Sequence, residues 1–179
     1  MKSLIPLALS AIMVPGLLAA QPGPVDNSTV SQFDLVKYLG TWYEIARFDH
    51  HFERGLNNVM AEYLLRDDGK IDVINSGWKD GDYKVANGKA KQPDPVNDPA
   101  HLRVSFFLFF YSDYNVMMLD QDYKTALVGS KSKDYLWILS RTPSVEDDVL
   151  DAILKEAERR GYDTSGLIWV DQSVNIITY

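Results

Sequence analysis

Short stretches of alternating apolar and polar residues fill most of the chain after residue 40, and turn-forming residues separate them. Alternation with a period of two is typical of β-strands that are buried on one face. Gly69 lies in the tight connection at 66–70, where glycine supplies a positive φ. Three prolines between residues 92 and 99 predict a loop. The pattern therefore predicts eight strands, at residues 42–49, 59–66, 70–78, 83–91, 102–109, 114–119, 123–130 and 135–140.

One helix is predicted after the strands. Ser144 offers an N-cap directly after Pro143, and Gly161 is a stop signal behind two arginines. Regularly spaced strands with short turns predict an all-β fold, either an antiparallel sandwich or an up-and-down barrel, and no internal repeat or second domain is visible. The helix is expected to pack on the outside of the sheet through one apolar stripe, formed by Val145, Val149, Ala152, Ile153 and Ala157.

The first twenty residues have the layout of a secretory signal peptide. Lys2 gives a positive start, residues 4–18 are uncharged and largely apolar, and Ala19 and Ala20 precede Gln21. Prolines and a glycine interrupt the apolar run, which is too short for a membrane span. Gln21 stands where a bacterial lipoprotein would carry the acylated cysteine, so a lipid anchor is not predicted. We therefore expect a signal peptide at 1–20, a flexible leader at 21–31 and one folded domain at 32–179.

The composition excludes several classes of function. Eighteen basic and 25 acidic side chains give a net charge of −7, and no run of Lys and Arg appears, which argues against a nucleic-acid partner. The chain has no cysteine, so disulfides, thiolate metal sites and a cysteine nucleophile are excluded. Aromatic residues make up 12% of the chain, which indicates a large apolar surface, either packed as core or lining a cavity.

Three motifs occur in order along the chain: GTWYEIARF at 40–48, LDQDY at 119–123 and YLWILSRTP at 135–143. With these motifs, residues 33–172 resemble the lipocalins, most closely the bacterial outer-membrane lipocalins and the apolipoprotein D branch. The resemblance implies an eight-stranded antiparallel up-and-down β-barrel, closed at one end and open at the other, with one C-terminal α-helix packed outside. A barrel of eight strands leaves space for one small ligand.

The motif residues have structural roles in this interpretation. Gly40 lets the backbone enter the first strand tightly. Trp42 closes one end of the barrel, and Arg141 lays its guanidinium across the indole, a contact worth about 0.5–2 kcal/mol. Asp122 and Tyr123 belong to the turn motif.

Alternation along the strands predicts which residues face the interior. Charges at Glu62 and Arg103 mark the outward face of their strands, and counting back from Arg141 in steps of two places Trp137 inside. Met118 belongs to the inward set of the sixth strand, and the resemblance supplies the third strand. The predicted ligand contacts are Ala61, Tyr63, Val73, Asn75, Val104, Phe106, Tyr114, Val116, Leu127 and Trp137, an apolar and aromatic lining that suits an acyl chain with a small polar end.

Metal and catalytic sites are not predicted. His50, His51 and His101 lack the spacing of a zinc motif and are interpreted as surface or rim histidines. No Gly-x-Ser-x-Gly motif appears, so an enzyme on the barrel is the last of the alternatives. Glu44 is expected to be a partner of Arg141 or of another cation.

The resulting hypothesis is a non-enzymatic, exported lipocalin without a cofactor. The resemblance implies a fatty acid or lysophospholipid ligand and lipid storage or transport in the cell envelope, in the periplasm, at the outer membrane or in the medium. The alternative is a filled barrel that acts through its surface. The aromatic run at 106–111 would place Phe107 and Phe109 outward, where they either pack beneath the helix or a loop or form an apolar patch for a homodimer or for peripheral contact with the outer membrane.

Overall fold

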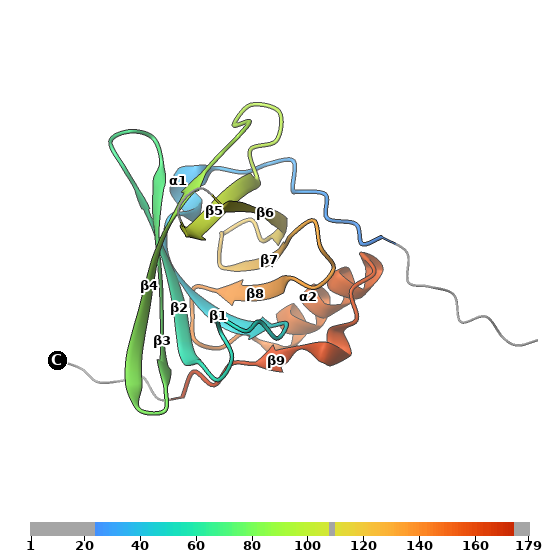
Figure 1. Ribbon diagram of the computed structural model, residues 1–179. Coiled ribbons are helices and arrows are strands. Elements are labelled where there is room, and N and C mark those ends of the chain that lie inside the picture. The colour runs from blue at the N-terminus through green and yellow to red at the C-terminus, as the bar shows by residue number, and fades with distance from the viewer. Residues whose placement is uncertain (1–23, 108–109, 174–179) are drawn as a thin grey trace, which may run out of the picture.

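The computed structural model describes residues 24–107 and 110–173. The expected signal peptide and Phe109 lie outside these residues. Antiparallel strands follow one another around a barrel, in the order β2-β3-β4-β5-β6-β7-β8-β1-β9, and pairing of β2 with β1 closes it (Figure 1). The strands are β1 (Gly40–Arg47), β2 (Asn57–Leu65), β3 (Ile71–Lys79), β4 (Asp82–Lys91), β5 (His101–Phe107), β6 (Phe110–Leu119), β7 (Thr125–Gly129), β8 (Leu136–Ser140) and β9 (Ile168–Trp169).

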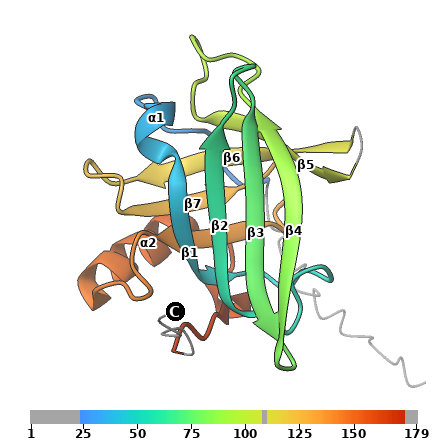
Figure 2. The same cartoon turned by 90° about the vertical axis from the view of Figure 1, so that its left-hand side faces the viewer.

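The expected barrel of eight strands is confirmed, with one extra strand. β1 to β4 lie side by side in Figure 2 and form one wall of the barrel. The two-residue β9 pairs with β1 at Ala46 and Arg47. Such a short strand leaves no alternating pattern, which is why the sequence did not predict it.

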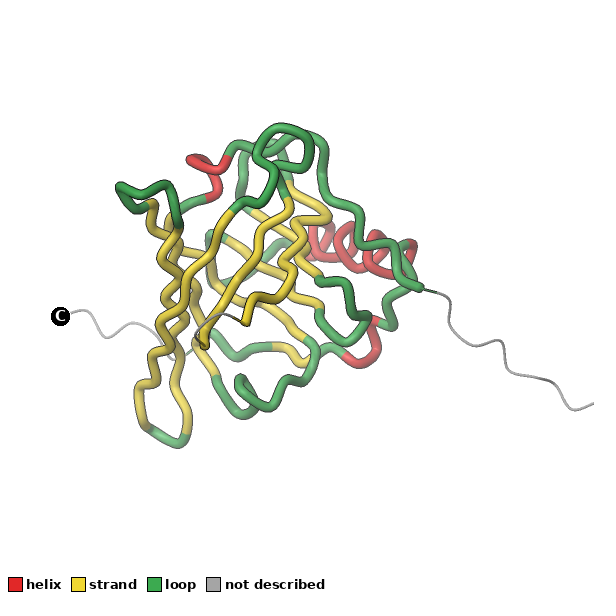
Figure 3. Tube along the Cα trace, turned by 45° about the horizontal axis from the view of Figure 1, so that its top comes forward, coloured by secondary structure: helices red, strands yellow, loops and turns green. Residues whose placement is uncertain are grey.

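The helix α2 (Asp147–Arg159) packs on the outside of the barrel, as expected (Figures 1 and 3). Of the expected stripe, Ile153 and Ala157 are completely buried against outward-facing residues of the barrel, whereas Val149 and Ala152 are exposed and Leu150 and Leu154 pack in their place. The N-cap is Glu146 and not the expected Ser144. Two short helical segments that the sequence did not predict are α1 (Leu35–Tyr38), just before β1, and the 3-10 helix η1 (Thr164–Gly166).

The leader was expected to be flexible, but residues 24–31 are held along the outside of the barrel. The backbone N–H of Val30 donates to the carbonyl of Val116 at 2.9 Å, and the N–H of Asp26 donates to the carbonyl of Arg160 at 2.8 Å. The buried Arg160 side chain donates back to the carbonyls of Asp26 and Ser28. Backbone hydrogen bonds between segments far apart in sequence leave no hydrophobic pattern, so the sequence did not show this attachment.

Two apolar clusters divide the core. The inner cluster fills the closed end of the barrel around Tyr38 and Trp42, and the outer cluster lies between the barrel wall and α2. The interior above the inner cluster is therefore available for a site.

Candidate functional site

The barrel contains a cavity of about 740 Å³. Residues from the β1–β2, β5–β6 and β7–β8 connections line its mouth, because alternate connections of an up-and-down barrel lie at the same end. The interior is therefore not filled, as the alternative interpretation required, whereas the surface role in that alternative stays a prediction. Eight of the ten predicted ligand contacts line the cavity: Ala61, Tyr63, Val73, Asn75, Val104, Phe106, Tyr114 and Trp137.

The structure places the other two predicted contacts elsewhere. Val116 points inward but is completely buried in the inner cluster with Trp42. Leu127 faces outward and packs in the outer cluster with Ile153 of α2, so its inward assignment is wrong. All five residues of β7 are buried, and a strand that is buried on both faces gives no alternation from which to choose a face.

Met118 also departs from the expected inward set. It packs against the outer cluster, whereas Val116 packs in the inner one. The register between β6 and β7 shifts between these two residues, which is the signature of a β-bulge. One extra residue reverses the face of every residue that follows, and alternation alone does not reveal it.

Three tyrosine hydroxyls form a hydrogen-bonded group at the inner end of the cavity. The Tyr114 hydroxyl lies 2.7 Å from that of Tyr38 and 2.9 Å from that of Tyr63. Burial raises the pKa of all three phenols, so they stay neutral. Tyr38 was missed because it lies in the short helix α1, outside the strand pattern.

A second polar group lies on the wall made by β1 and the β1–β2 connection. The buried Arg47 guanidinium contacts Oε1 of Glu44 at 2.5 Å and donates to the carbonyls of Glu53 and Leu56. Glu53 accepts a hydrogen bond from Nε1 of Trp137 at 3.2 Å. Glu44 thus has the cation partner that the sequence suggested, but the cation is Arg47 and not Arg141.

Burial governs the protonation of this group. It raises the pKa of Glu44 to about 8, an effect that the charge of Glu53 strengthens and the charge of Arg47 opposes. Burial also raises the pKa of Glu53. Both carboxyls therefore hold a proton to higher pH than a solvent-exposed glutamate does. Arg47 and Glu53 are residues that the sequence analysis missed; the charge of Arg47 in an otherwise apolar strand was the available signal.

His50 lies in the β1–β2 connection near the mouth, but it is buried and not exposed at the surface. Its ring stacks on Tyr135 at 4.7 Å and on Phe52 at 5.3 Å, and it lies 5.0 Å from the Trp137 ring. Burial lowers the pKa of His50 to about 4, so the ring is neutral. His51, in contrast, is exposed at the mouth of the cavity.

The closed end has the predicted arrangement of Trp42 and Arg141. The Arg141 guanidinium lies 3.8 Å from the centre of the Trp42 ring, and Trp42 is completely buried. Gly40 has a φ of 90°, and a Cβ there would lie 3.6 Å from the guanidinium. The structural roles of these three residues are therefore well founded.

The turn motif is organised differently from the expectation. The exposed carboxylate of Asp122 accepts from the side chain of Lys124, whereas Asp120 accepts from the backbone N–H groups of Asp122, Lys124 and Thr125. Tyr123 has a φ of 58°, and its hydroxyl accepts from the backbone N–H of Asp34. Asp120, not Asp122, is the carboxylate that holds this turn.

Phenylalanines surround part of the mouth. Phe107 and Phe110 are 67% and 73% exposed, and their rings stack 6.3 Å apart. Phe106 lies against Gly88, where an added Cβ would come within 2.7 Å of its ring. Phe107 is exposed as expected, but it lines the mouth of the cavity together with Phe106 and Phe110, so it does not point away from the interior.

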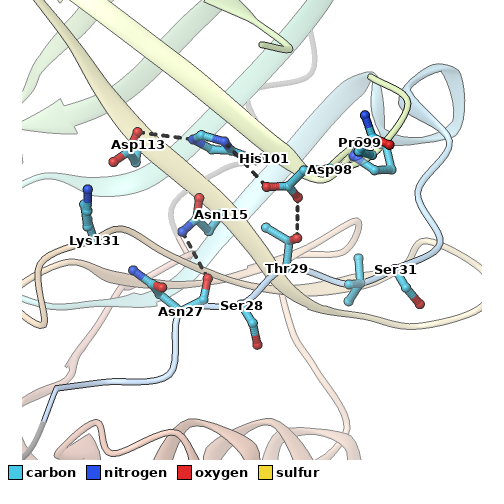
Figure 4. A pocket seen from close by; sticks show the side chains of 12 residues that line it. Asn27, Ser28, Thr29, Ser31, Asp98, Pro99, His101, Asp113, Asn115 and Lys131 are labelled. Carbon is cyan, nitrogen blue, oxygen red and sulfur yellow. Dashed lines mark hydrogen bonds and ion pairs between the residues drawn. The ribbon is translucent and has the colours of Figure 1, made fainter. Parts of the chain in front are cut away.

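A second, open and polar pocket lies outside the barrel, between the leader and β5–β6 (Figure 4). His101 lies there 3.2 Å from Asp113 and 3.7 Å from Asp98, and Asp98 accepts from the hydroxyl of Thr29. Within the described ranges no group of three or more His, Asp or Glu residues is arranged to hold a metal ion. In the same part of the chain, no helix is long and apolar enough to cross a membrane.

Comparison with known proteins places the chain in a family. A family profile described as a lipocalin-like domain matches residues 33–172. The chain is 48% identical to outer membrane lipoprotein Blc of Escherichia coli strain K12, over 94% of this chain and 96% of that protein. It is 34% identical to apolipoprotein D of Mus musculus, over 79% and 78% of the two chains. The solved structure of insecticyanin from the tobacco hornworm Manduca sexta has the same fold, with a TM-score of 0.70 at 24% identity over 85% and 91% of the two chains.

The fold and the site define a class of small β-barrel that encloses an apolar cavity open at one end. Within this class, the chain belongs to the lipocalin family. Lipocalins are generally binding and transport proteins rather than enzymes.

Proposed function

We propose that this protein is an exported carrier that binds one single-chain lipid, a fatty acid or a lysophospholipid, inside the barrel. The observation that carries the proposal is the cavity of about 740 Å³, whose lining is mostly apolar and whose mouth is open to solvent. Burying an acyl chain there stabilises the complex by about 0.8 kcal/mol per methylene. The carrier performs no chemistry.

The cell envelope is the proposed location. The similarity to proteins named outer membrane lipoprotein supports export, as does the signal-peptide pattern at 1–20. Gln21 in place of a cysteine supports a form without a thioether-linked lipid.

The test is a titration of residues 21–179 after delipidation. Fatty acids and lysophospholipids of several chain lengths are added and followed by calorimetry. We expect saturable binding to one site with a preferred chain length, and a loss of affinity of about tenfold or more in Trp137→Ala, because the truncated indole no longer covers the chain. Trp169→Ala, at an exposed tryptophan of β9, is the matched control and should leave affinity unchanged. Absence of saturable binding by the folded protein would refute the proposal.

A second candidate function rests on the exposed rings of Phe107 and Phe110. An apolar rim around the mouth suits contact with a lipid surface or with a second copy of the chain. Phe107→Ser together with Phe110→Ser should abolish vesicle association or self-association, whereas Trp137→Ala, a change deeper in the cavity, should leave that association intact. Binding to neither vesicles nor a second copy by the native chain would exclude this function.

A further inference from the structure

Glu44, Arg47 and Glu53 form a charged group, hereafter the wall group, on the wall made by β1 and the β1–β2 connection. The wall group places two carboxyl groups against one guanidinium, and both carboxyls belong to the cavity lining. Oε1 of Glu44 accepts a hydrogen bond from Arg47, and Oε2 of Glu53 accepts one from Trp137. Within the described residues, the second oxygen of each carboxyl has no hydrogen-bond donor.

An alkyl chain lying on this wall would cover carboxyl oxygens without giving them a hydrogen bond, and burying such groups unpaired is unfavourable. A carboxylate placed there would add a third acidic group opposite one guanidinium. A hydrogen-bond donor with a positive charge satisfies both requirements, because it supplies N–H groups and replaces the proton that burial otherwise keeps on this pair of carboxyls.

We propose that Glu44 and Glu53 select single-chain amphiphiles whose polar end carries an ammonium group, and that they disfavour free alkyl carboxylates. This inference rests on the proposed binding of a lipid in the barrel and narrows it. Exposed Lys84 and Lys131 at the mouth offer a carboxylate a different place, outside the wall group. Substitutions can therefore distinguish the contribution of the wall group to ligand binding from that of the lysines at the mouth.

The experiment compares three probes with the same C12 chain, dodecylamine, dodecanol and dodecanoate, each below its micellar concentration, on the full folded domain at pH 7.5. We expect the native protein to bind the amine at least tenfold more tightly than the carboxylate, with the alcohol between them. Glu53→Gln should reduce this ratio to about threefold or less. Its side-chain oxygen still accepts from Trp137, so the fold is preserved. Glu44→Gln is the second variant and should change the ratio in the same direction.

Glu62→Gln removes the same charge from the outward face of β2 and is the matched control. Lys131→Gln tests the mouth. The inference is overturned if the ratio of amine to carboxylate affinity changes in Lys131→Gln or Glu62→Gln and stays the same in the Glu44 and Glu53 variants. It is also overturned if the native protein binds dodecanoate more tightly than dodecylamine. Equal, saturable binding of all three probes would refute the selectivity alone, whereas no binding of any probe would refute the carrier function with it.

Discussion

Arg141 holds the closed end of the barrel through Trp42 and the backbone around it. Its guanidinium lies 3.8 Å from the centre of the Trp42 ring and donates to the carbonyls of Thr41, Lys37, Tyr38 and Leu39 at 2.6–3.0 Å. One planar cation therefore binds an aromatic face and joins the end of β8 to α1 and to the start of β1. This combination suits arginine and not lysine, because the guanidinium presents several donors in a fixed plane.

We expect Arg141→Ala to lower the free energy of unfolding by about 3 kcal/mol, since it removes charge-assisted hydrogen bonds and the contact with Trp42. Arg141→Lys should recover only part of this loss. Urea denaturation measures both values. Arg66→Ala, at an exposed arginine paired with Asp68 and Asp72, is the control and should cost less than about 1 kcal/mol. Equal losses at positions 141 and 66 would contradict the assigned role.

Leu127 should affect stability and not binding. Leu127→Ala removes a completely buried side chain from the outer cluster, and we expect the free energy of unfolding to fall by about 3 kcal/mol. Lipid affinity, measured by calorimetry on the fraction that remains folded, should change less than twofold. A large loss of affinity would mean that Leu127 contacts the ligand after all.

Ala61 should show the opposite behaviour. Its side chain points into the cavity, so Ala61→Phe fills space that a ligand would occupy. We expect lipid affinity to fall about tenfold or more, while stability changes by less than about 1.5 kcal/mol because the ring enters an existing space. If binding is unchanged, the ligand does not occupy the part of the cavity near β2.

Glu44 should make the protein less stable as the pH rises from 6.5 to 8. Its pKa is about 8 in the folded state against an ordinary value of 4.5, so the folded state holds more protons than the unfolded state in this interval. Stability from this group is complete below pH 4.5 and is lost as the pH approaches 8; Glu53 acts in the same direction. Denaturation midpoints across the interval should fall for the native protein and for Glu62→Gln, and should be flatter for Glu44→Gln. Parallel curves for all three would refute the prediction.

His50 should make the protein less stable as the pH falls below 6.5. Its pKa is lowered to about 4, so the unfolded chain takes up a proton below pH 6.5 that the folded protein does not. Stability from this group is present above pH 6.5 and is lost between 6.5 and about 4. His50→Phe, which keeps the stacked ring, should remove this loss, whereas the exposed His51→Gln should not. If the native protein and His50→Phe lose the same stability between pH 6.5 and 4, His50 is not a buried neutral histidine.

Strand alternation was sufficient for most of the cavity wall. On β2, the charge of Glu62 between Ala61 and Tyr63 fixes the inward face, because a carboxylate prefers solvent. The same reasoning succeeded for Val104 beside Arg103 on β5. It failed for Leu127, where every neighbour in the strand is apolar and both faces are buried.

The sequence by itself determined the order of the strands, the outer position of the helix, the contact of Trp42 with Arg141 and the family, because these follow from local alternation and from motifs. Only the tertiary structure decided the pairing of Glu44 with Arg47, the burial of His50 among three aromatic rings, and the attachment of residues 24–31 to β6 and to Arg160. These features depend on burial and on contacts between segments far apart in the chain. The free energy of a buried charge is set by the neighbours that folding brings to it, and a linear pattern does not contain them.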